Sequence, residues 1–150
     1  MNSSVSYTVR AAYCHHRASD EEIFDTISSI IEPLKKSIEK IDNAKKIVVK
    51  ANMAWPPEHI AYFEGRRREL VDDSVLRAVL KFLRNRTNAE IIATDVDARD
   101  VSQTDGINYI PILDEFGVKF INSNAPPFHI YDVPGGGFMF SRYKLSECFV

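Results

Sequence analysis

Residues 46–53 constrain the fold of this chain more than any other segment. The run from Ile47 to Val49 is β-branched throughout, and such a run favours a strand that is buried on both faces, as in a parallel sheet. Pro56 and Pro57 follow shortly afterwards, and proline cannot continue a central strand. The segment therefore predicts a central strand that ends just before these prolines.

Two polar side chains stand at the carboxyl end of this expected strand. Lys50 and Asn52 alternate with Ala51 and Met53, so the two polar groups leave the strand on one side. Open α/β sheets place their ligand crevices at the carboxyl ends of strands. We therefore expect Lys50 and Asn52 to belong to a ligand site. The alternative interpretation is that Lys50 reaches solvent on its long stem and that Asn52 caps the following turn.

Residues 49–53, Val-Lys-Ala-Asn-Met, resemble the Ile-Lys-Pro-Asn-Leu signature of a prokaryotic group called domain of unknown function family 362. The resemblance extends more loosely over residues 5–150, and residues 70–80 take the place of the helix that follows the signature. It implies a ligand-binding or redox-associated enzyme, because some members carry four-iron four-sulfur ferredoxin modules. The cysteine pattern for such a cluster is not in this chain, so we expect no cofactor here and an iron-sulfur cluster only through sequence beyond residue 150.

Length and charge favour one globular domain. The chain has 150 residues, 45% of them hydrophobic, and its 19 basic and 21 acidic residues give a formal charge of −2. Nucleic-acid-binding domains are usually basic. The basic cluster at residues 66–68 is bracketed by Glu64 and Glu69, which predicts a solvated loop or helix start and no nucleic-acid partner.

The sequence also predicts where the protein works. The N-terminus lacks the pattern of a secretory signal, and no apolar run approaches the roughly 18 residues of a membrane span. We expect a cytoplasmic protein with no membrane partner. Cys14 and Cys148 are far apart in sequence, so we expect reduced thiols and no disulfide framework.

Helix signals occupy the first half of the chain. Ser19 and Glu22 form a capping-box pattern ahead of isoleucines at helical spacing. Pro33 should kink this helix or split it in two. A second helix should begin at Asp72 or Asp73 and end near residues 87–88.

The other expected elements complete an α/β fold. They are strands at residues 5–13, 89–96 and 118–122, a short helix at 106–116 stopped by Gly117, and a hairpin of residues 128–133 and 138–143 around Gly135, Gly136 and Gly137. Strand, helix and strand in this order predict parallel pairing. The predicted fold is a three-layer α/β sandwich with a mostly parallel sheet of about four strands, followed by a β-hairpin.

A third candidate site residue lies at the end of the strand at 89–96. If that strand neighbours the one at 46–53, Asp95 comes within salt-bridge reach of Lys50, in a polar crevice that could hold a small anionic ligand. A structural ion pair is the alternative. His15, His16, His59 and His129 lack the spacing of a metal site, and we expect exposed loop histidines and no metal.

The C-terminal residues 145–150 are largely apolar, without a polar tail. We expect residues 1–150 to form a single α/β domain that is the N-terminal part of a longer one, with self-association through its C-terminal segment. The leading hypothesis is a ligand-binding or redox-associated enzyme domain that uses Lys50, Asn52 and Asp95. The alternative is a non-catalytic partner module that docks on an iron-sulfur or metabolic protein.

Overall fold

The protein is built around a three-stranded parallel sheet. The computed structural model describes residues 8–53, 59–96 and 109–150. The sheet contains β1 (Lys46–Lys50), β4 (Glu90–Asp95) and β5 (Lys119–Asn122) in the order β1-β4-β5. Val49 pairs with Ala93, and Ala93 with Phe120. The predicted α/β class, the parallel pairing and the C-terminal hairpin are confirmed.

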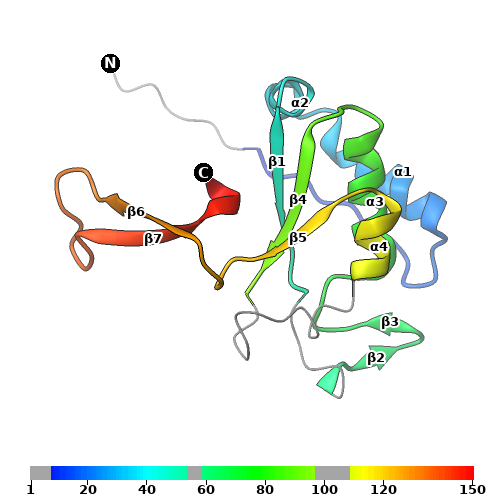
Figure 1. Cartoon of the computed structure of the whole chain (residues 1–150). Coiled ribbons are helices and arrows are strands. Elements are labelled where there is room, and N and C mark those ends of the chain that lie inside the picture. Colours follow the sequence, from blue (N-terminus) through cyan, green and yellow to red (C-terminus); the bar gives the residue numbers. More distant parts are fainter. Residues whose placement is uncertain (1–7, 54–58, 97–108) are drawn as a thin grey trace.

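Helices cover one face of this sheet (Figure 1). They are α1 (Asp20–Ile31), α2 (Lys35–Asp42), α3 (Asp73–Arg84) and α4 (Ile110–Glu115). Leu76, Leu80 and Leu83 of α3 form one core with Ile91 and Ala93 of β4, and α1 packs against α3. α1 ends at Ile31 and α2 begins at Lys35, so the expected break at Pro33 is confirmed as a split.

The C-terminal segment covers the opposite face of the sheet. Ile92 and Thr94 alternate with the core residues of β4 and are buried. Cys148 Sγ lies 3.8 Å from Thr94 Oγ1. Cys148 belongs to the 3-10 helix η2 (Glu147–Phe149), which follows the antiparallel pair β6 (Phe128–Asp132) and β7 (Arg142–Ser146). The hairpin itself projects away from the sheet (Figure 1).

The first expected strand is wrong over its described part. Residues 8–13 form no strand, and the side chains of Val9 and Tyr13 are 92% and 85% exposed. Alternation of apolar and polar residues indicates a strand only where a neighbour pairs with it, and no described strand lies beside this segment. Residues 5–7 lie outside the described residues.

The secondary structure of the basic cluster at residues 66–68 also differs from the expectation. β2 (Tyr62–Phe63) and β3 (Arg66–Arg67) form a small antiparallel hairpin. Its two loop residues, Glu64 and Gly65, have φ values of 48° and 81°, and tight two-residue hairpin turns require such positive values. Arg66 and Arg67 are therefore in a strand and half-buried, rather than in a solvated loop or helix start.

The remaining boundaries shift by a few residues. α3 ends at Arg84, earlier than expected, and α4 begins at Ile110, with the expected start at 106 outside the described residues. Gly117, at φ 59°, follows α4 as predicted. The second hairpin strand begins at Arg142 instead of residue 138, because residues 133–141 form a longer loop that includes the turn at Pro134 and Gly135. Within the described ranges, every helix is too short or too polar to cross a membrane.

Candidate functional site

The strand-end cluster consists of Lys50, Asn52 and Asp95. Lys50 is the last residue of β1, and Asp95 is the last residue of β4. Lys50 Nζ lies 2.7 Å from Asp95 Oδ1, and the Lys50 side chain is 52% exposed while that of Asp95 is 7% exposed. The structure therefore brings together the two charges that the sequence placed at neighbouring strand ends.

Asp95 also holds backbone groups from two other segments. Its second oxygen, Oδ2, accepts a hydrogen bond of 2.6 Å from the backbone N–H of Met53. Its carbonyl oxygen accepts from the backbone N–H of Ser123, beyond β5. A buried carboxylate is costly unless it is paired and hydrogen-bonded. Asp95 satisfies that requirement and ties the ends of all three strands together.

Asn52 is directed to a different part of the chain. Its side-chain nitrogen donates to the carbonyl of Glu69 at 2.7 Å, and its own carbonyl accepts from the backbone N–H of Val71. These bonds fix the segment that leads into α3. Asn52 thus holds a segment 17 positions along the chain, whereas the following turn, which the alternative interpretation had it cap, lies largely outside the described residues.

A second polar region was not identified from the sequence. A cavity of about 730 Å³, here called the arginine cleft, lies between residues 12–16, α1 and the β2–β3 hairpin. Its apolar wall includes Ile23, Ile27 and Ile30 of α1, and its basic side is formed by Arg66, Arg67 and Arg68. The cleft is formed by segments that are far apart in sequence, so no local motif marks it.

Ion pairs orient two of the three arginines. Arg66 Nη1 donates to Asp72 Oδ1 and Arg67 Nε to Asp73 Oδ1, both at 2.8 Å. The Arg67 guanidinium also lies over the ring of Tyr109, 4.6 Å from its centroid. The Arg-Arg and Asp-Asp pairs are six residues apart in sequence, and this repeated spacing is the one signal that could have indicated the arrangement.

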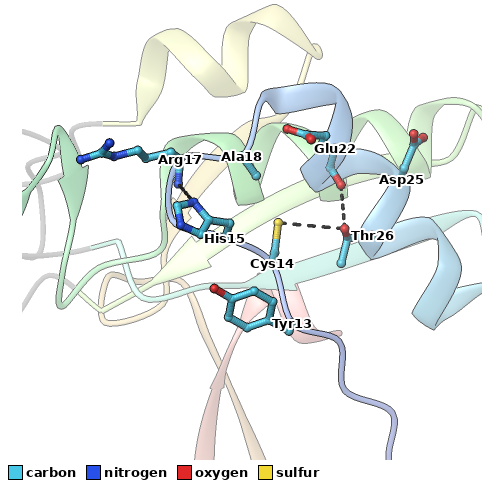
Figure 2. A pocket seen from close by; sticks show the side chains of 8 residues that line it. All are labelled: Tyr13, Cys14, His15, Arg17, Ala18, Glu22, Asp25 and Thr26. Carbon is cyan, nitrogen blue, oxygen red and sulfur yellow. Dashed lines mark hydrogen bonds between the residues drawn. The ribbon is translucent and has the colours of Figure 1, made fainter.

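A smaller cavity of about 530 Å³ adjoins the arginine cleft (Figure 2). The two cavities share Cys14, His15 and Thr26. Thr26 Oγ1 lies 4.0 Å from Cys14 Sγ and donates to the carbonyl of Glu22. His15 Nδ1 accepts from the backbone N–H of Arg17, so the neutral ring carries its proton on Nε2.

The two adjacent histidines are exposed to solvent, which is the environment that the sequence predicted. His15 and His16 are exposed, as predicted, and His16 Nε2 lies 2.7 Å from Glu64 Oε2. A hydrogen bond from Arg17 lowers the pKa of the Glu64 carboxyl below its ordinary value. Both cysteines are free thiols, Cys14 exposed and Cys148 buried.

Comparison with protein-family models, curated proteins and solved structures found no match. The resemblance of residues 49–53 to family 362 therefore stays a prediction. Among the described residues, no three histidine, cysteine, aspartate or glutamate side chains are grouped so that they could hold a metal ion. Function has to be inferred from the geometry of the strand-end cluster and of the arginine cleft.

Proposed function

We propose that this protein is a cytoplasmic ligand-binding domain, related to family 362 and associated with redox enzymes, that binds a small anion at the carboxyl ends of β1 and β4. The supporting observation is the 2.7 Å contact between Lys50 and the buried Asp95. It holds a half-exposed ammonium at the edge of the sheet where α/β proteins bind ligands.

The hydrogen bonds of Lys50 leave room for a ligand oxygen. An ammonium has three donors. One is directed to Asp95 Oδ1 and a second to the carbonyl of Ala51 at 3.1 Å. Among the described residues the third donor has no acceptor, so it remains for an anion that approaches from solvent. Asn52 supports the site indirectly, because it fixes the chain that follows β1.

The negative charge of Asp95 repels an incoming anion, so removing that charge should change the affinity for the anion. Replacing Asp95 with asparagine retains an acceptor for Lys50 and removes the negative charge. If Lys50 holds the anion, Asp95→Asn should strengthen anion binding. If the pair is purely structural, this substitution should change stability and leave anion binding unaffected.

Titration with inorganic phosphate tests the proposal directly. Lys50→Ala should weaken phosphate binding roughly tenfold, because one charge-assisted hydrogen bond is lost. Lys46→Ala is the matched control, since Lys46 lies at the opposite end of the same strand and donates to the carbonyl of Val150. Equal affinity in Lys50→Ala and the unmodified protein, or an equal loss in Lys46→Ala, would refute the proposal.

The C-terminal hairpin favours a second candidate function, a partner module that docks on an iron-sulfur or metabolic protein. Phe138, Met139 and Phe140 are 105%, 76% and 68% exposed. Exposed apolar clusters commonly mark interaction surfaces. Replacing these three residues with serine should abolish partner binding and leave phosphate binding unchanged if the hairpin is the functional surface.

A further inference from the structure

The arginine cleft combines an apolar wall with a cationic side. Ile23, Ile27 and Ile30 lie along one face of α1 and are joined by Val75 from α3 and by Phe63 from β2. Ile23 is buried, Ile27 and Ile30 are half-buried, and Phe63 is 55% exposed. Ligand sites usually combine an apolar lining of this kind with a few placed polar groups.

Among the residues that the structure describes, one positive charge of the cleft has no counter-charge. Asp72 pairs with Arg66, and Asp73 pairs with Arg67. Arg68 is exposed, lines the cleft, and forms no side-chain hydrogen bond or ion pair within the described ranges. The basic side therefore has the charge to bind one negative group.

Arg67 contributes less to the cleft than Arg68, because its guanidinium is buried. Its side chain is only 10% exposed, and its Nη1 is a buried nitrogen without a hydrogen-bond partner in the described part of the chain. Burying a donor without an acceptor is costly. The guanidinium of Arg67 is directed to Tyr109 and Asp73, which do not line the cleft, so Arg68 is the charge that a ligand can reach.

The length of the apolar wall limits the size of the ligand. Ile23 and Ile30 are seven positions apart on α1, so the wall is about 10 Å long at the helical rise of 1.5 Å per residue. A cavity of about 730 Å³ lies within the size range of small-molecule sites. These dimensions fit a ligand with an extended apolar body of modest length.

We propose that the arginine cleft binds a small amphipathic monoanion, a medium-chain carboxylate. Its apolar body lies along Ile23, Ile27 and Ile30, and its carboxylate binds the guanidinium of Arg68. Guanidinium groups match carboxylates geometrically, because both are planar and can form paired hydrogen bonds. This site is separate from the strand-end cluster and does not depend on the function proposed for Lys50.

Three probes separate the contributions of charge and apolar body. Octanoate has both, octanol lacks the charge, and acetate lacks the body. Calorimetric titration of the full chain should show octanoate binding at least tenfold more tightly than either of the others. Lack of octanoate binding, or equal affinity for octanoate and octanol, would overturn the proposal.

Two arginine variants locate the carboxylate. Arg68→Ala should weaken octanoate binding about tenfold and leave octanol binding unchanged. Its folding should be normal, because the Arg68 side chain has no partner in the described part of the chain. Arg142→Ala is the matched control, since Arg142 is an exposed arginine on the distant hairpin. Equal loss in both variants would indicate nonspecific attraction and contradict the site.

Amide chemical shifts locate the apolar body and distinguish the two proposals. Octanoate should shift the amide signals of residues 23–30, and shifts confined to residues 138–150 would overturn the assignment. Lys50→Ala should leave octanoate binding unchanged, and Arg68→Ala should leave phosphate binding at the strand ends unchanged. Failure of one proposal is therefore visible independently of the other.

Discussion

Asp95 shows how a single buried carboxylate can organise the edge of a parallel sheet. It accepts from the Lys50 ammonium through one oxygen and from the Met53 N–H through the other. The two donors differ in exposure, so the loss of Asp95 would affect them differently. Lys50 can return to water when its partner is removed, whereas the N–H of Met53, a fully buried residue, cannot.

Asp95→Ala should therefore destabilise the protein much more than Lys50→Ala. We expect a loss of about 2–3 kcal/mol for Asp95→Ala, because a buried N–H loses its acceptor. Lys50→Ala should cost about 1 kcal/mol or less, because exposed ion pairs contribute little. Urea denaturation of both variants measures the difference, and similar losses would contradict this view of the pair.

Tyr109 is fully buried, and its hydroxyl donates to the carbonyl of Val71 at 2.6 Å. Tyr109→Phe should reduce the free energy of unfolding at neutral pH by about 1 kcal/mol, the usual net contribution of such a bond.

The stability that Tyr109 contributes should depend on pH. Burial raises the pKa of the Tyr109 phenol above its ordinary value near 10. The unfolded chain therefore loses this proton first, and the contribution is complete below pH 10 and declines above it. The stability difference between the unmodified protein and Tyr109→Phe should shrink between pH 10 and 11. A constant difference would contradict the shift.

Among the elements, α1 has the start signal that the sequence predicted. Ser19 Oγ accepts from the backbone N–H of Glu22, and the Glu22 carboxylate accepts from that of Ser19. Ser19→Ala should cost about 1 kcal/mol, because the first turn loses its cap. Ser29→Ala, on the exposed side of the same helix, should change stability by less than half as much. Thermal denaturation of both variants makes the comparison.

Elements with local signals were predictable, and elements that depend on distant partners were not. The strand at Ile47 and the cap at Asp72 each depend on residues within a few positions. The alternating pattern through Val9 lacks a described partner strand, and the β2–β3 hairpin depends on the positive φ of Glu64, a residue that gives no sign of it in the sequence.

The same distinction between local signals and distant partners applies to the candidate sites. Lys50 and Asp95 could be paired from sequence because parallel neighbours bring their carboxyl ends to one edge. The bond from Asn52 to Glu69 could not be predicted, because it depends on the path of the loop before α3. The arginine cleft was missed because α1 and β3 meet only in the folded chain, where Arg66 donates to the carbonyl of Ala18.

At the scale of the molecule, the hairpin tip carries the apolar cluster of Phe138, Met139 and Phe140. An exposed apolar cluster of this kind favours association. Sedimentation velocity should show concentration-dependent self-association of the 150-residue protein, and replacement of the three residues with serine should reduce it. A protein that stays monomeric at all concentrations would contradict the expected self-association.

Because Cys148 is buried against Thr94, its reaction with a thiol reagent reports whether the C-terminal segment covers the second face of the sheet. A thiol reagent reacts only with an accessible thiol, and Cys14 is exposed while Cys148 is buried. In a Cys14→Ser variant, Cys148 should be labelled only after the C-terminal segment separates from β4. Its rate then measures the free energy of that opening. Rapid labelling of folded Cys14→Ser would show that the segment detaches readily. Slow labelling would show that the segment stays packed on the sheet, opposite the helices.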